Sequence, residues 1–233
     1  MASRTNEHGQ QIGPTIDGWA PCPFPDVATL RGSWCRVEPL LAEHSTELYD
    51  ELCGPGNEDL WTYLPVEMPA DRAEFAELIE ARADLIDAVA VLIRTADGTA
   101  AGTATLMRVD RANGSVEVGW IVLGRSLQRT TAATEAQYLL AKHAFDLGYR
   151  RYEWKCDALN EPSRRAAARL GFVPEGRFRQ ALVYKGRNRD TDWFSITDAE
   201  WPTLAAAFQQ WLDPDNQPDG RQVRSLGDVR GDR

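Results

Sequence analysis

Residues 119–147 read GWIVLGRSLQRTTAATEAQYLLAKHAFDL, and this stretch predicts the end of a strand, a short polar loop and a helix. The strand, residues 115–122, is rich in the β-branched and aromatic residues that fit a pleated surface. Apolar residues then recur at the spacing of one helix face, at Ala136, Leu139, Leu140, Ala144 and Leu147. A strand therefore leads directly into a helix.

The loop at residues 128–134, QRTTAAT, leads into the start of that helix. The first backbone N–H groups of a helix lack intrahelical partners, and the helix dipole is positive at this end. Such a turn is either an ordinary strand-to-helix connection with good capping residues or an anion site, most often for phosphate. The rest of the chain has to decide between the two interpretations.

Composition excludes several classes of protein. With 43% hydrophobic and 26% charged residues, and no run of 18 apolar ones, the chain is typical of a soluble globular protein without a transmembrane helix. Its N-terminus lacks the apolar core of a signal peptide, and its four cysteines have neither zinc-type nor disulfide-framework spacing. We therefore expect a cytoplasmic protein with no metal and no membrane partner.

The net charge of −9 argues against general nucleic-acid binding, yet the charge is unevenly distributed. Residues 1–100 hold 6 Lys or Arg against 18 Asp or Glu, whereas residues 148–189 hold 11 against 4. Either one half meets an anion and the other a cation, or solvated surface charge simply drifts in composition. We expect no nucleic-acid partner in either case.

Residues 26–212 are expected to form a single domain, preceded by a flexible polar arm (1–25) and followed by a disordered tail rich in Asp, Gly and Arg (213–233). The patterns predict strands at 30–37, 88–94, 101–109, 115–122, 151–156, 173–184 and 191–196. They predict helices at 40–52, 71–85, 160–170 and 198–211, besides the central helix that ends before Gly148. A helical crossover between two strands indicates a parallel or mixed sheet.

Three linked motifs resemble the GNAT superfamily of N-acetyltransferases, and its RimJ/RimL-like branch most closely. They are EVGW at 117–120 with the loop and ATEA at 133–136, NEPS at 160–163 with LGF at 170–172, and KGRNRD at 185–190 with its flanking strands. The resemblance covers about residues 27–203. It implies an α/β fold with a mixed, mostly antiparallel central sheet flanked by helices, in which the cofactor-binding strand splays from its parallel neighbour.

The resemblance also implies acetyl-CoA, or another short acyl-CoA, as co-substrate, without a metal. The phosphates are expected on the loop and helix start at Gln128, Arg129, Thr130, Thr131, Ala132, Ala133 and Thr134. A backbone N–H among Ile121, Val122 and Leu123 is expected to face the thioester oxygen. Asn160 is expected to contact the cofactor. Arg164 and Arg165 either reach its nucleotide end or form a solvated helix face.

One position departs from the family pattern. The acyl-CoA loop of the family usually reads Gln/Arg-x-x-Gly-x-Gly/Ala, and Thr131 stands where the first glycine is expected. Glycine permits close backbone approach to a pyrophosphate, whereas a β-branched residue adds bulk and narrows the allowed backbone. The Thr131 hydroxyl could instead donate to a phosphate oxygen.

For the proton of the amine, the resemblance implies Glu117 as the base. A carboxyl group partly buried on this strand would have a raised pKa. The alternative is a surface glutamate that pairs with a basic residue across the sheet. Glu135 is a weaker candidate, because the helix dipole explains an acidic residue in the first turn, and His143 lies mid-helix in a structural position.

For the proton that the leaving thiolate gains, much of the superfamily uses a tyrosine at the position of Ala167. In the RimJ/RimL-like branch a serine that matches Ser163 has this role, so Ser163 is the candidate acid. Asn160 and Ser163 are alternatively helix-capping groups.

The acceptor is expected to meet Trp61 and Tyr63, exposed-type aromatics in a loop at residues 54–69. The same loop carries acidic residues that suit a protonated amine, namely Glu58, Asp59 and Glu67. The alternative is a loop whose aromatics close the edge of the core.

Two functions remain open. The first is transfer of an acetyl group from acetyl-CoA to a primary amine of a protein N-terminus, a lysine or a small molecule, by direct attack in a ternary complex; a succinyl-CoA-using relative is a variant of it. The second is an inactive GNAT-fold module that binds acyl-CoA or another protein. Homodimers occur in the resembling branch, so a homodimer is compatible with both.

Overall fold

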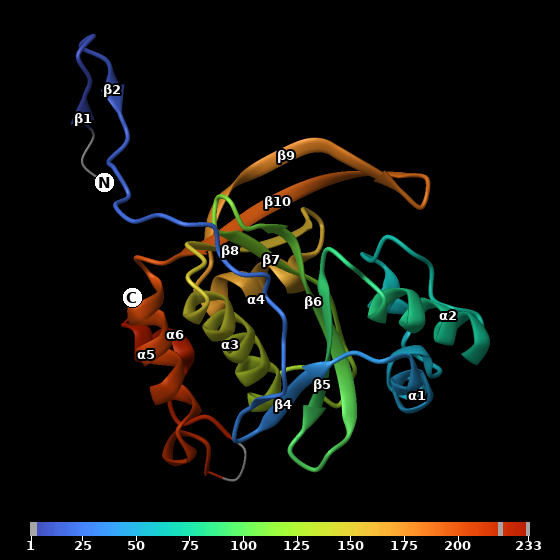
Figure 1. Ribbon diagram of the computed structural model, residues 1–233. Coiled ribbons are helices and arrows are strands. Elements are labelled where there is room, and N and C mark those ends of the chain that lie inside the picture. Colours follow the sequence, from blue (N-terminus) through green and yellow to red (C-terminus); the bar gives the residue numbers. More distant parts are fainter. Residues whose placement is uncertain (1–3, 219–220, 232–233) are drawn as a thin grey trace.

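The computed structural model describes residues 4–218 and 221–231 (Figure 1). Its centre is an eight-stranded sheet with the strand order β3-β4-β5-β6-β7-β8-β10-β9. The strands are β3 (Leu30–Arg31), β4 (Cys35–Pro39), β5 (Val89–Thr95), β6 (Ala100–Asp110), β7 (Ser115–Leu123), β8 (Arg151–Asp157), β9 (Val173–Tyr184) and β10 (Arg187–Thr197). Only β7 and β8 pair in parallel; the other neighbours are antiparallel. The expected mixed, mostly antiparallel sheet is confirmed.

Helices cover both faces of this sheet (Figure 1). One face is covered by α1 (Ser45–Cys53) and α2 (Arg72–Ala83), whose apolar residues form a cluster with those of β5 and β7. The other face carries α3 (Thr131–Asp146), α4 (Glu161–Leu170), α5 (Trp201–Leu212) and α6 (Leu226–Arg230) over the larger cluster. Short 3-10 turns are η1 (Ala42–His44), η2 (Glu58–Trp61) and η3 (Pro214–Asn216). The two clusters make the sheet the shared wall of two cores.

The central helix α3 is the crossover that the parallel pair requires. Its predicted face is largely correct, since Ala136, Leu140 and Ala144 are fully buried against the sheet. Predicted capping residues are also confirmed: Asp71 accepts two N–H groups at the start of α2, and Asn160 accepts one at the start of α4. Local sequence signals thus position the ends of the helices that border the site.

Three predicted boundaries are wrong. The first strand is interrupted between β3 and β4, because Glu135 of α3 accepts the N–H groups of Ser33, Trp34 and Cys35 at 2.6–2.8 Å. The first helix is divided into η1 and α1. The KGRNRD segment is a tight turn at Lys185 and Gly186, after which β10 begins at once.

The prediction of a disordered tail at 213–233 is wrong for its described part. Leu226 of α6 is 1% exposed and belongs to the main core, and the Trp211 indole donates to Gln222 at 3.1 Å. A capping box of Ser225 and Asp228 begins α6. The polar composition of this segment gave no sign of its one buried apolar residue, Leu226, or of its capping box. Together they fold a short segment against the domain.

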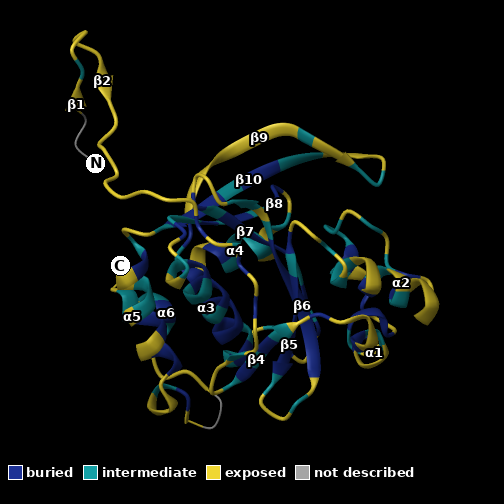
Figure 2. Ribbon diagram, viewed as in Figure 1, coloured by how far each residue is buried: buried dark blue, intermediate teal, exposed yellow. Residues whose placement is uncertain are grey.

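At the other end, residues 4–12 form the hairpin of β1 (Arg4–Thr5) and β2 (Gln11–Ile12), which projects from the body of the molecule and is almost wholly exposed (Figures 1 and 2). The arm joins the domain near Trp19, whose indole donates to the carbonyl of Ala112 at 2.9 Å. Its flexibility stays a prediction. No helix in the described ranges is long and apolar enough to span a membrane.

Candidate active site

The parallel strands β7 and β8 separate part-way along their length. Their ladder joins Ser115–Val118 to Arg151–Trp154 and ends there. Beyond it β7 pairs with β6 alone, while β8 pairs with β10. The three residues expected at the thioester lie on this opened part of β7: Ile121, Val122 and Leu123. The splayed pair implied by the resemblance is therefore present.

A β-bulge marks the same place. Gly119 pairs with Thr105 and Val122 with Thr103, so β7 holds one residue more than β6 between these pairs. Trp120 within the bulge has a left-handed φ of 48°. Bulges re-aim side chains and often lie beside active sites, and a non-glycine residue at such a φ is a strained feature of the kind found there.

The loop after β7 presents free backbone donors. Arg129 has a φ of 61°, and Thr130 then caps α3 by accepting the N–H of Ala133 at 3.2 Å. For the N–H groups of Arg129, Thr131 and Ala132, no hydrogen bond is recorded within the described residues. A left-handed residue before a helix start gathers N–H groups into an anion-binding concavity. This observation favours the phosphate interpretation and fits an acyl-CoA pyrophosphate.

The side chains of this loop mainly hold the loop itself. Gln128 Nε2 donates to the carbonyl of Leu123 at 2.9 Å, and Thr130 Oγ1 donates to the carbonyl of Leu127 at 2.6 Å. The Arg129 side chain is exposed and has no ion pair in the described part of the chain. The arrangement leaves backbone N–H groups as the main phosphate donors.

Thr131 has an ordinary helical backbone as the first residue of α3. The left-handed residue of the loop is Arg129, so the threonine in the expected glycine position causes no backbone strain. Its hydroxyl lies 3.1 Å from Gln217 Oε1 of the C-terminal segment and donates to it. Thr134 is buried and accepts from Arg169 at 3.0 Å. The two hydroxyls connect the start of α3 to α4 and to the C-terminal segment.

Glu117 is both buried, as expected for a base with a raised pKa, and paired with basic residues, as in the alternative interpretation. It is 6% exposed, and its carboxylate lies 2.9 Å from Lys155 Nζ and 3.2 Å from Arg108 Nε. Lys155 also lies 2.7 Å from the Glu153 carboxylate and 3.7 Å from the centroid of the Trp193 ring. Burial raises the pKa of Glu117 above its ordinary value, although both cations oppose the rise.

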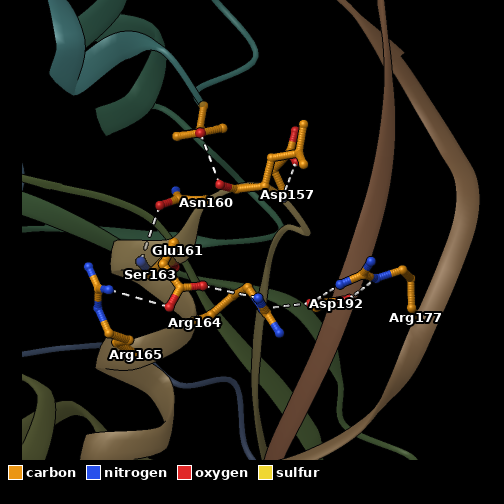
Figure 3. Close-up of polar contacts among 10 residues, drawn as sticks. Asp157, Asn160, Glu161, Ser163, Arg164, Arg165, Arg177 and Asp192 are labelled. Carbon is orange, nitrogen blue, oxygen red and sulfur yellow. Dashed lines mark hydrogen bonds and ion pairs between the residues drawn. The ribbon is translucent and has the colours of Figure 1, made fainter.

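At the start of α4 the polar contacts are local (Figure 3). Asn160 Oδ1 accepts the N–H of Ser163 at 3.1 Å, and Ser163 Oγ accepts the indole N–H of Trp154 at 3.0 Å. Both residues therefore have the structural contacts of the capping alternative. The Asn160 Nδ2 group has no recorded hydrogen bond in the described ranges and is available to a ligand.

Arg164 and Arg165 of α4 are paired with carboxylates (Figure 3). Arg164 lies 2.9 Å from Asp192 and 3.1 Å from Glu161, and Arg165 lies 3.4 Å from Glu161. Asp192 is shared with Arg177 of β9 at 2.7 Å. The contact of Arg164 with the nucleotide stays a prediction, and it would require this network to rearrange.

The prediction that Trp61 is an exposed-type aromatic is wrong. Its side chain is 3% exposed, because η2 turns it into the apolar cluster beneath α1, where the indole donates to the carbonyl of Leu52 at 2.9 Å. Tyr63 is half-buried, and its hydroxyl donates to the carbonyl of Leu159 at 3.0 Å. Tyr63 thus joins the loop at residues 54–69 to the segment that precedes α4.

The acidic residues of this loop are largely paired as well. Asp59 forms an ion pair with Arg125, and Glu67 lies 3.2 Å from Lys185 of the β9–β10 turn. Lys185 also donates to the carbonyl of Trp61 at 2.7 Å. An open groove of about 540 Å³ lies between this loop and the turn, lined by Glu58, Trp61, Thr62, Glu67, Met68, Lys185 and Arg187. A cationic acceptor would therefore meet mixed rather than uniformly negative charge.

Comparison with known proteins decides the family. Residues 36–173 match the family described as acetyltransferase (GNAT) domain. The chain belongs to the GNAT family. It is 29% identical over 142 residues to "Putative ribosomal N-acetyltransferase YdaF" of Bacillus subtilis (strain 168), a match that covers 60% of this chain and 72% of the relative. The resemblance seen in the motifs is confirmed.

Solved structures of GNAT proteins share the fold over most of this chain. A GCN5-related N-acetyltransferase from Brucella melitensis has a TM-score of 0.90 and 44% identity, covering 93% of this chain and 100% of that one. A probable acetyltransferase of the GNAT family from Chromobacterium violaceum ATCC 12472 has a TM-score of 0.78 and 36% identity, covering 82% and 96%. The present chain is accordingly an N-acetyltransferase.

Two features of this GNAT site lie outside the residues that the motifs indicated. Lys155 is the buried partner of Glu117, and its signal was available: Arg151, Glu153 and Lys155 alternate with apolar residues along β8 and so share one face. Gln217, in contrast, lies in a segment with no apolar pattern. Among the described residues, no group of three or more His, Cys, Asp or Glu is arranged to hold a metal ion.

Proposed function

We propose that this GNAT protein transfers the acetyl group of acetyl-CoA to the primary amine of a protein N-terminus, a lysine or a small molecule, by direct attack in a ternary complex. The observation that carries the proposal is the set of free N–H groups of Arg129, Thr131 and Ala132 beside the opened edge of β7. Acetyl-CoA supplies the acyl group as an activated thioester. The name of the Bacillus subtilis relative supports a protein among the acceptors.

In this proposal one part of the site holds the cofactor and another part faces the acceptor. The N–H groups at the start of α3 hold the pyrophosphate, and the side chain of Asn160 adds a donor near the middle of the cofactor. A backbone N–H of the opened part of β7 polarises the carbonyl that is attacked. On the acceptor side Trp61 lines the groove, and Tyr63 of the same loop joins it to the segment before α4.

Two proton transfers complete the reaction. Glu117 takes the proton of the amine, through a water molecule, since its raised pKa brings the carboxylate closer to the pH at which a base is effective. Ser163 donates its hydroxyl proton to the departing thiolate and regains a proton from water before the next cycle. Its hydroxyl oxygen accepts from Trp154 and its hydroxyl also bonds to the Cys156 sulfur, so donation to the thiolate would replace the contact with Cys156.

The first test is calorimetric titration with acetyl-CoA, followed by measurement of CoA release with a panel of amines. Micromolar affinity, on the order of −8 kcal/mol, together with amine-dependent CoA release supports the proposal. Absence of binding contradicts it. Binding without turnover on any protein, peptide or small amine would favour a module that has lost catalysis.

A pair of variants separates backbone from side chain in the phosphate site. Thr131→Pro removes one free N–H at the first position of α3, where proline is tolerated and where Thr130 already has the extended backbone that precedes proline. We expect about tenfold weaker acetyl-CoA binding, since a hydrogen bond to a charged group contributes about 1.5–3 kcal/mol. The matched control Thr131→Val keeps the N–H and should bind within about threefold of the wild type. Equal affinities for all three proteins would contradict the assignment.

A further inference from the structure

Arg82 is a half-buried arginine beside the bulge of β7. It belongs to the last turn of α2, and its guanidinium lies over the Trp120 ring at 4.1 Å from the centroid. One of its N–H groups donates to Thr105 Oγ1 of β6. Trp120 lies in the bulge, and Thr105 pairs with Gly119 beside it. The Arg82 side chain therefore contacts β7 at the residue just before Ile121, where the opened part with the expected thioester contacts begins.

The surroundings of this guanidinium are mostly apolar. It borders a small cavity of about 20 Å³ beneath α2, whose apolar walls include Leu78, Ile79, Trp120 and Val122. Burial lowers the pKa of Arg82 to about 10, so the side chain is still charged at neutral pH. A charge in such surroundings is unfavourable unless an opposite charge accompanies it.

Arg94, which is buried, has carboxylate partners. The Arg94 side chain is 10% exposed and pairs with Glu38 and Glu47. Within the described residues, Arg82 pairs with no carboxylate, and its single recorded hydrogen bond uses one of five N–H donors. The donors that remain lie in the plane of the guanidinium, over the Trp120 ring, and this planar group can bind a carboxylate with two parallel hydrogen bonds.

We propose that Arg82, stacked on Trp120, binds a carboxylate carried by one of the two reactants of the acyl transfer. This inference rests on the proposed function, because it places the carboxylate beside the acyl position. The carboxylate has two sources: the far end of a dicarboxylic acyl group on the CoA donor, or an acidic group of the amine acceptor. Both place the same anion on the same guanidinium, and the two arms of the experiment distinguish them.

The donor arm compares succinyl-CoA with butyryl-CoA, whose acyl groups have the same number of carbons but differ in the terminal carboxylate. Calorimetric dissociation constants are measured for the wild type, Arg82→Gln and Arg82→Lys. If the donor carries the anion, the wild type prefers succinyl-CoA by about tenfold or more (~1.4 kcal/mol). Arg82→Gln then loses this preference, and Arg82→Lys keeps part of it because a point charge replaces the bidentate fork.

The acceptor arm uses acetyl-CoA and pairs of peptide amines that differ only by Glu against Gln beside the reacting amine. CoA release gives kcat/KM for each member. If the acceptor carries the anion, the wild type prefers the Glu member by about tenfold, and Arg82→Gln abolishes the preference. The matched control in both arms is Arg72→Gln, also on α2, because Arg72 stacks on Tyr49 at 4.4 Å but is exposed and paired with Asp50.

A preference for the carboxylate in either arm that Arg82→Gln removes and Arg72→Gln retains supports the proposal and identifies the reactant. No carboxylate preference in either arm, or a preference that survives in Arg82→Gln, overturns it. If Arg82→Gln does not fold, as judged by circular dichroism, Arg82→Lys is used instead. A reduced carboxylate preference in Arg82→Lys then supports the proposal, and an unchanged preference overturns it. Failure of the proposed function is recognised separately, since the wild type would then bind neither acetyl-CoA nor the other thioesters.

Discussion

Glu117→Gln tests the catalytic base with little change in shape. A positioned general base contributes about 10²–10⁴-fold to a rate, so kcat is expected to fall by about 10²-fold or more, which corresponds to at least ~2.7 kcal/mol of barrier. The dissociation constant of acetyl-CoA should stay within about threefold, because the pyrophosphate site at α3 involves other residues. The assay is CoA release at saturating acetyl-CoA, with calorimetry for binding.

The pH dependence gives the variant a second readout. Burial raises the pKa of Glu117, and the reaction requires its carboxylate form. Activity of the wild type should therefore be lost as pH falls through this raised pKa, and Glu117→Gln should lack that limb. For stability the sign is opposite, because a folded carboxyl with a raised pKa binds protons more tightly than the unfolded chain. Above that pKa the ionised Glu117 makes folding less favourable.

The matched control is Glu153→Gln, because Lys155 lies between the two carboxylates at 2.9 and 2.7 Å. Either change leaves the buried ammonium with one carboxylate, yet only Glu117 is proposed to touch the reacting amine through water. We expect Glu153→Gln to reduce kcat less than tenfold and to keep the acidic limb. Equal losses in both variants would mean that an unbalanced Lys155 causes the defect, and the assignment of the base would be refuted.

Four further changes have defined outcomes. Ser163→Ala should lower kcat by roughly 10²-fold if the hydroxyl is the acid; an unaltered rate would reduce Ser163 to a structural residue. Glu135→Gln should lower the free energy of unfolding by about 3 kcal/mol in urea denaturation, since it weakens three backbone hydrogen bonds to a buried charge. Gln217→Ala should cost about 1 kcal/mol in the same assay by leaving the Thr131 hydroxyl without its acceptor, and no change would question that contact. Leu226→Ala should cost about 2–4 kcal/mol, whereas a disordered tail would give no effect.

Much of the fold followed from local signals. The β-branched and aromatic composition of residues 115–122, the capping groups Asp71 and Asn160 and the apolar face of α3 each act over a few residues, and the strand, the caps and most of the face are confirmed. Where a distant group intervenes, prediction failed: Glu135 interrupts the first strand from a helix about a hundred positions away. No local pattern contains that contact.

The site shows the same division. The position of the loop at residues 128–134 before a helix leaves an ordinary connection and an anion site both open, and the N–H groups without partners among the described residues favour the anion site. Trp61 is predicted as an exposed-type aromatic in a loop, but η2 turns it into the core, as in the alternative in which the aromatics close the core edge. The alternation along β8 places Lys155 on one face with Arg151 and Glu153, but its burial against Glu117 follows only from the parallel pairing of β7 and β8.

The sequence by itself determined the order of the main strands and helices between residues 30 and 212, the strand–loop–helix unit at residues 115–147, and the family, because periodicity, caps and motif spacing are short-range properties of the chain. Only the tertiary structure decided which charges are buried together, that the C-terminal segment joins the core through Leu226, and that Arg82 lies over Trp120 with no carboxylate partner among the described residues. Those outcomes depend on the solvation and pairing of groups that are far apart along the chain. They are settled only when the sheet brings such groups within a few ångströms and removes water from between them.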